Sequence, residues 1–144
     1  MSLRIYDNVS GSATPFSVDA VFTNPISFSF DGRVGGVLEM LLYVRNTDVL
    51  YRYEDLEVTV AQTSGSLDLI GGTQGFSFKL KSGDTRPSDE EWATISAANT
   101  ISLEDIPDTV TYLPFWLRIE VPRQIPVQRF HGVSLKTLAT QILV

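Results

Sequence analysis

Apolar and polar residues alternate along most of this chain, over residues 25–144. The clearest segment runs from Pro25 to Gly32, where Ile26, Phe28 and Phe30 fall on one face and two serines fall on the other. A period of two residues that ends in an Asp-Gly pair is typical of a half-buried antiparallel strand. We therefore expect a chain built from strands that each bury one face.

Similar alternation recurs at strand-length intervals, and Gly, Pro, Asn or Asp residues separate the segments. About eight short strands with turns between them are typical of a sandwich and not of an α/β unit. We predict an all-β, antiparallel β-sandwich of immunoglobulin-like or jelly-roll-like type, with little or no helix, as one domain over residues 25–144. Besides 26–30, the expected strands are 37–45, 56–61, 67–70, 76–81, 101–103, 113–122 and 133–144. The best candidates for the core are Phe28, Leu42, Phe78 and Leu117.

Two of these strands carry an irregularity. Pro114 cannot donate a hydrogen bond to a ladder, so we expect its strand to start late, at a sheet edge or a bulge. The apolar phase slips between Leu135 and Leu138, which indicates a bulge in the last strand.

One segment between strands has a different character. Residues 82–91 are rich in polar residues, Gly and Pro, and are expected to form an exposed connection. The only helix we expect is a short turn at 87–93, because Ser88 can act as its N-cap with Glu91 three residues on.

Residues 1–24 are less regular than the rest of the chain, because their apolar residues are interspersed with Ser, Gly, Asp and Asn. Two interpretations stay open. The segment is either an ordinary first strand with its connection, or an extended arm that lays its apolar residues on a neighbouring chain. In the second case the assembly contacts are Leu3, Ile5, Tyr6, Phe16, Val18 and Phe22.

The composition is that of one ordinary globular domain. The chain has 144 residues, of which 43% are hydrophobic and 19% charged, enough to bury a core without disulfides or metals. Its formal net charge is −6 and its basic residues are scattered, whereas nucleic-acid binding favours a basic patch. It has no cysteine, which removes disulfides, thiolate metal sites and thiol nucleophiles. We expect no nucleic-acid partner.

The start of the chain and its hydropathy bear on where the protein works. Residues 1–7 lack the apolar region of a secretion signal, and no run approaches 18 uninterrupted apolar residues. We therefore expect no secretion signal, no membrane partner and synthesis in a cytoplasm.

Side chains suited to catalysis or cofactor binding are sparse. The single histidine, His131, lies in a turn, and the chain has no Gly-x-Ser-x-Gly nucleophile elbow. One histidine cannot supply the multi-histidine ligand sets of zinc or non-haem iron. We expect no enzyme, no catalytic residue, no cofactor and no metal. Calcium is the hardest ion to exclude, with three acidic groups as candidates: Glu54, Asp55 and Glu57; Asp84, Asp89, Glu90 and Glu91; Glu104, Asp105 and Asp108.

Aromatic residues outside the clear core positions offer another kind of site. Exposed aromatic rings on a β-sandwich can stack on sugars, although such residues more often belong to a core or an interface. The candidates for surface aromatics are Tyr51, Tyr53, Tyr112 and Trp116, with Tyr43 in the same pool.

Two stretches carry a resemblance to a known family. The first comprises FDG at 30–32, GGVLE at 35–39, LYVRN at 42–46 and YEDLEV at 53–58, and the second is LPFWLRIEVP at 113–122. With these segments the chain resembles the small immunoglobulin-like β-sandwiches found among structural proteins of tailed bacteriophages, over about residues 25–144. It lacks the Cys pair of a conventional immunoglobulin domain.

The resemblance implies a role in a virion. It implies a non-enzymatic head decoration, neck, tail or baseplate protein, located in the virion and acting as a homo-oligomer that docks on other virion proteins. The family has no catalytic residues to carry over. The alternative that stays open is a carbohydrate- or receptor-binding β-sandwich module, because the same fold supports such binding. A small hydrolase is the third hypothesis.

Overall fold

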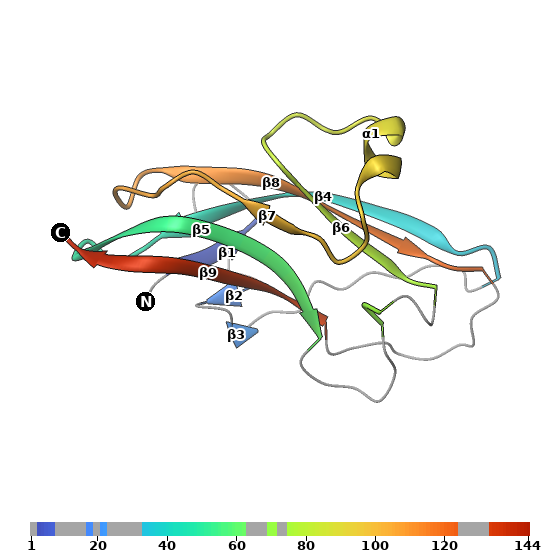
Figure 1. The fold of residues 1–144 in the computed structure, drawn as a ribbon, viewed down its shortest axis with the longest axis horizontal. Helices are drawn as coiled ribbons and strands as arrows, with labels where there is room; N and C mark the ends of the chain where they lie inside the picture. The colour runs from blue at the N-terminus through green and yellow to red at the C-terminus, as the bar shows by residue number, and fades with distance from the viewer. Residues whose placement is uncertain are drawn as a thin grey trace.

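The fold is an all-β sandwich of two antiparallel sheets, as the alternation predicts (Figure 1). A computed structural model describes residues 3–7, 17–18, 21–22, 33–62, 69–71, 75–123 and 133–144. The predicted strand at 26–30, the core candidate Phe28 and the turn at His131 lie outside the described residues.

The strands of each sheet follow one another in a defined spatial order. The first sheet has the order β3 (Val21–Phe22), β2 (Ser17–Val18), β1 (Leu3–Tyr6), β4 (Gly36–Asn46), β8 (Tyr112–Val121) and β6 (Ser77–Ser82). The second sheet has the order β7 (Thr100–Ser102), β5 (Tyr51–Gln62) and β9 (Val133–Leu143). All pairings are antiparallel.

From β4 onward, consecutive strands alternate between the two sheets. β4, β6 and β8 belong to the first sheet, and β5, β7 and β9 belong to the second. Every connection in this part therefore crosses from one sheet to the other, and none closes a hairpin. The connections 47–50 and 103–111 consequently meet at one end of the sandwich, although they are far apart in the sequence (Figure 1).

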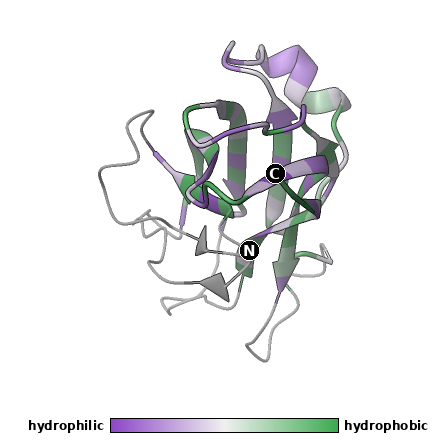
Figure 2. Ribbon diagram, turned by 90° about the vertical axis from the view of Figure 1, so that its left-hand side faces the viewer, coloured by the Kyte–Doolittle hydropathy of each residue, from purple (hydrophilic) through white to green (hydrophobic). Residues whose placement is uncertain are grey.

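The core lies between the sheets and is lined by the apolar faces that the alternation predicts. Leu42, Phe78 and Leu117 are all buried, which confirms them as core residues. Figure 2 shows hydrophobic and hydrophilic residues following one another along the strands. Each strand therefore turns one side chain in two toward the opposite sheet.

Two residues of the N-terminal segment, Leu3 and Ile5, are part of this core. β1 pairs with β4 in the register Ile5↔Val44, and the side chains of Leu3, Ile5 and Tyr6 are buried. These three residues are therefore not available to a neighbouring chain, which corrects their prediction as assembly contacts. Of the remaining predicted contacts, Phe16 lies outside the described residues, and Val18 and Phe22 are placed only as backbone of β2 and β3.

The sequence predicts a bulge in the last strand, β9, but the bulge of the second sheet lies in β5. Glu54 faces Thr140 and Glu57 faces Leu138, so two β5 residues oppose one residue of β9. Asp55, one of the two, has a φ of 54°, which aspartate tolerates better than most residues. The bulge turns both Tyr53 and Leu56 inward, three residues apart.

Pro114 occupies a central strand, contrary to the prediction of a late start at an edge. β8 begins at Tyr112 and pairs with β4 through the register Tyr43↔Pro114. The Pro114 carbonyl accepts a hydrogen bond of 3.0 Å from the N–H of Gly83, just beyond the end of β6. The nitrogen of a strand residue points to the same side as its carbonyl. The N–H that Pro114 lacks would therefore point toward β6, at a position where β6 has already ended, so no ladder hydrogen bond is lost.

Residues 83–99, here called the strap, connect β6 to β7 and fold back over the outer face of the first sheet (Figure 1). The strap contains the helix α1 (Asp89–Thr94), whose N-cap Ser88 accepts a hydrogen bond from the N–H of Glu91 at 3.2 Å. This confirms the predicted helix. The strap is not merely an exposed connection, because Pro87 is buried and Trp92 is only 1% exposed.

Candidate docking surfaces

Exposed apolar side chains gather at one end of the sandwich. Three segments meet there: the loop between β4 and β5, the residues that lead into β8, and the C-terminal residues after β9 (Figure 1, at the end that carries the C label). Figure 2 looks at the molecule from this end. We call this surface the apolar end, and its side chains are 47–75% exposed: Val49, Leu50, Val110, Tyr112, Leu143 and Val144.

The first segment, residues 47–50, is held by polar side chains at its base. The side-chain amide of the buried Asn46 donates to the carbonyl of Tyr51 at 2.8 Å, and its oxygen accepts the N–H of Asp48 at 2.8 Å. The Asp48 carboxylate in turn accepts the N–H of Leu50 at 2.9 Å. An Asx turn of this kind fixes the backbone, so Val49 and Leu50 project from a braced loop.

The second segment is held in the same way, by an aspartate carboxylate that accepts backbone N–H groups. The Asp108 carboxylate accepts the N–H groups of Val110 at 3.0 Å and of Thr111 at 2.7 Å. A hydrogen bond from the Thr111 side chain and these backbone bonds lower the pKa of Asp108 below its ordinary value. Arg45 donates to the carbonyl of Thr109 at 3.2 Å, which ties this loop to β4.

A third contact joins the C-terminal residues to the first loop. The N–H of Val144 donates to the carbonyl of Leu50 at 2.9 Å, next to the pairing of Tyr51 with Leu143. The apolar end is thus three chain segments bonded into one surface. A surface already fixed in this way loses less conformational entropy when a partner covers it.

A second candidate surface is the outer face of the first sheet, where the strap is attached by charges. The carboxylate of Glu39 accepts two hydrogen bonds from Arg86, at 2.6 and 3.0 Å, and one from Arg118 at 2.6 Å. Arg118 also contacts Glu120 at 2.9 Å, and its guanidinium lies 6.0 Å from the ring centroid of Trp92. The network fastens the strap to the sheet.

The electrostatics of this network favour its charged form. Burial by itself would lower the pKa of Arg118, but hydrogen bonds to Glu120 and Glu39 outweigh burial and raise it. Lys79 adds a hydrogen bond of 3.0 Å to the carbonyl of Trp92. These charged side chains therefore hold Trp92 against the sheet, and their role in the fold is to attach the strap.

The four predicted surface aromatics are divided between the two faces of the sheets. Tyr53 is fully buried in the core, which corrects its prediction as a surface residue, and Tyr51 is partly buried and packs against the core. Tyr112 and Trp116 do share the outer face of the first sheet with Tyr43. The Tyr43 and Tyr112 rings stand at 81° with centroids 5.5 Å apart, so they do not form a flat stacking platform.

The acidic candidates for calcium do not converge in the part of the chain that the structure describes. Asp105 accepts the N–H of Asp55 at 3.2 Å, which is a backbone contact at the bulge. Within the described ranges, no three His, Cys, Asp or Glu side chains are grouped as metal ligands would be. Among the same residues, no helix is long and apolar enough to cross a membrane.

Of the apolar end, only Tyr112 is predicted from the sequence. A signal was present, because Val49, Leu50 and Val110 each follow an aspartate within two residues, at turn positions where polar residues are usual. Aliphatic residues in a short turn between strands can be buried or exposed, and only the fold decides which.

The chain was compared with protein-family models, with curated protein sequences and with solved structures. No family model matches it, and neither curated sequences nor solved structures give a match. The functional interpretation therefore rests on the surfaces just described.

Proposed function

We propose that this chain is a non-enzymatic structural protein of a tailed-bacteriophage virion, which acts by self-association and by docking on other virion proteins. The observation that carries the proposal is the apolar end. Large exposed apolar patches on a globular domain commonly mark sites of protein–protein contact. Synthesis in a host cytoplasm and incorporation into the particle belong to the same proposal.

The construction of the apolar end supports docking. Its aliphatic side chains belong to loops whose backbones are held by Asp48 and Asp108. A backbone hydrogen bond between Val144 and Leu50 joins the last residue to the first of these loops. A braced apolar surface binds a partner with little reorganisation, and its burial supplies about 25 cal/mol for each Å² removed from water.

The segments that carry the virion resemblance, apart from FDG at 30–32, which lies outside the described residues, belong to three long strands. GGVLE and LYVRN at 35–46 form β4, YEDLEV at 53–58 lies in β5, and LPFWLRIEVP at 113–122 forms most of β8. They thus supply the paired strands at the centre of the sandwich. The apolar end lies where these strands begin or end.

Purified particles give the direct test. Particles from a lysate in which this gene is expressed are banded in a density gradient, and their proteins are counted by quantitative mass spectrometry. We expect the chain to stay with the particles at a fixed copy number, and we expect Leu50→Asp to lower that number while Leu138→Asp does not. A chain that separates completely from the particles overturns the proposal.

A carbohydrate- or receptor-binding module is the weaker candidate. It is favoured only by the shared face of Tyr43, Tyr112 and Trp116, and the 81° angle between the tyrosine rings disfavours sugar stacking across both. Glycan binding that is measurable by calorimetry and lost in Trp116→Ala would support it over the virion role.

A further inference from the structure

We infer that the partner of the apolar end is a second copy of this chain, placed by a two-fold axis so that the two apolar ends cover each other. The inference rests on the proposed function, because it names the partner of the docking surface proposed there. Three features of the molecule carry it: the size of the apolar surface, the distribution of charge and the repeated construction of the two loops.

The apolar end is large enough for the centre of a dimer interface. It presents six apolar side chains that are 47–75% exposed. Such a set amounts to several hundred Å² of apolar surface, against the roughly 800 Å² that each partner contributes to a standard interface. The remaining area would come from the polar rim of the same three segments, as is usual for protein interfaces.

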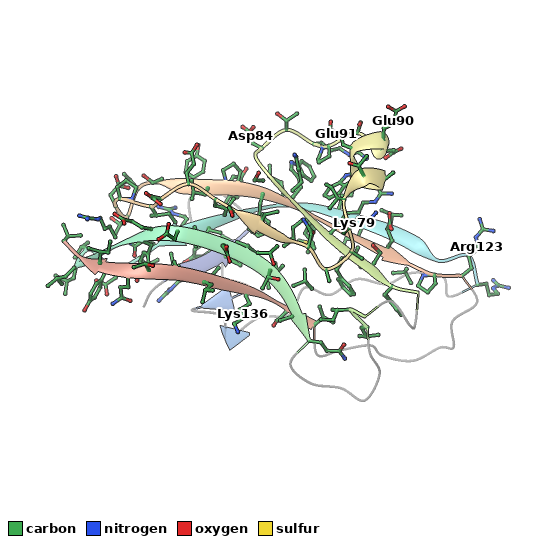
Figure 3. All side chains as sticks on the ribbon, viewed as in Figure 1. Lys79, Asp84, Glu90, Glu91, Arg123 and Lys136 are labelled. Atoms are coloured by element: carbon green, nitrogen blue, oxygen red, sulfur yellow. The ribbon has the colours of Figure 1, made fainter. Side chains whose placement is uncertain are left out.

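The distribution of charge favours a copy of the same end. The chain has a net charge of −6, and the exposed side of the strap carries Asp84, Glu90 and Glu91 (Figure 3). Two copies that meet at their apolar ends keep these acids apart. At the apolar end itself the carboxylates of Asp48 and Asp108 accept backbone N–H groups.

Other ionic side chains at this end are also held by bonds. Arg52 and Glu54 approach to 3.4 Å, and Arg45 is bonded to the carbonyl of Thr109. The charges at this end are of both signs, with Asp48, Asp108 and Glu54 against Arg45 and Arg52, so a strongly charged partner would find no strong complementary field. The surface suits an apolar partner of its own composition.

The two loops make a two-fold arrangement possible. Each presents aliphatic side chains just after an Asx turn, at Asp48–Leu50 in one and at Asp108–Val110 in the other. The second loop is bonded through Thr109 to Arg45 of β4, which directly precedes the Asn46 that holds the first loop. In an isologous interface both copies use the same patch, so one part of the patch on the first copy contacts a different part on the second copy, and the reverse contact is also made. We expect loop 47–50 of each copy to pack on loop 108–112 of the other.

Sedimentation equilibrium on the purified full chain tests the pairing. Over about 1 µM to 1 mM, a range that covers weak and moderate interfaces, we expect a reversible monomer–dimer equilibrium that stops at the dimer. Leu50→Asp should lower the association constant about tenfold or more, because its carboxylate would be desolvated in the interface. Leu138→Asp is the matched control, since Leu50 is 59% and Leu138 60% exposed.

Cysteine cross-linking tests the geometry, because the natural chain has no cysteine. A Leu50→Cys chain is mixed with a Val110→Cys chain under mild oxidation. We expect the mixed disulfide dimer to form faster than any dimer of Leu138→Cys. Mixed dimers no more frequent than those of Leu138→Cys overturn the two-fold arrangement.

Each remaining outcome separates this inference from the proposed function. A chain that stays monomeric up to the highest concentration, yet enters particles through the apolar end, overturns the second copy and leaves the virion role standing. A dimer that Leu50→Asp does not weaken overturns the apolar end as its interface. A dimer that follows every expectation but never enters a particle supports this inference and overturns the virion role.

Discussion

The strap and the apolar end are both built by connections between the two sheets, yet they treat apolar residues in opposite ways. The strap is acidic in sequence, but it buries Trp92 against the sheet and is attached to the sheet through Arg86 and Asp89. The apolar end is aliphatic, but its backbone is held by Asn46, Asp48 and Asp108 while its side chains face solvent. A loop's composition thus does not tell whether its side chains are covered.

The two regions should also differ in whether their side chains stabilise the fold or the association of the chain. Side chains of the strap should matter for folding, because they are covered within the chain. Side chains of the apolar end should matter for association, since changing an exposed residue usually alters stability by less than about 0.5 kcal/mol.

The largest expected effect is at the buried residue of the strap. Trp92→Ala should lower the free energy of unfolding by about 3–5 kcal/mol, because it empties a fully covered position. Denaturation followed by circular dichroism measures it. Trp116→Ala, at a half-buried ring whose nitrogen bonds the carbonyl of Asp84, should cost less. Equal losses would show that the strap is no better packed than the open part of the same face.

The next effect concerns the charges that fasten the strap. Glu39→Gln leaves Arg86 and Arg118 without their shared carboxylate and should cost about 1–3 kcal/mol. Salt screens charges, so the difference from wild type should shrink in urea titrations at high ionic strength. The exposed Glu57, changed to Gln, is the control. A loss at Glu39→Gln that does not respond to salt would mean that packing and not charge attaches the strap.

A smaller effect is expected at the end of the strap, where Asn99 covers the edge of β6. Its side chain accepts the N–H of Leu80 at 2.7 Å and donates to the carbonyl of the same residue at 2.8 Å. Asn99→Ala should cost about 1–2 kcal/mol and leave an open edge that favours aggregation. Hydrogen exchange at the Leu80 amide should quicken, and Ser96→Ala should leave it unchanged. An unchanged rate in Asn99→Ala would contradict this protection.

The smallest effect is a pH dependence of the apolar end. The pKa of Asp108 is lowered from 3.8, so its stabilisation of the loop is fully present above 3.8 and is lost as pH falls through the lower folded value. Association of the chain should therefore weaken only in strong acid. Asp108→Asn keeps an acceptor without the charge, and its association should lose this pH step. An identical acid step in Asp108→Asn would assign it to another group.

Most of the strands could be predicted because each carries its own period. Leu42, Phe78 and Leu117 are buried where the alternation places them, and α1 begins after Ser88, which is its local capping residue. The bulge could not be predicted, because Tyr53 and Leu56 are both inward only through the pairing of β5 with β9. The same bulge moved Tyr53 from the predicted surface into the core.

The sequence by itself determined the β class, the inward faces of the long strands and the helix start, since these depend on residues within a few positions of one another. Tertiary structure decided the order of the strands, the burial of Trp92 and the position of Leu3 and Ile5 in the core. It also assembled the apolar end from residues as distant as Leu50 and Val144. The reason is physical: each of these contacts joins segments that are distant in the sequence, and no local pattern relates them.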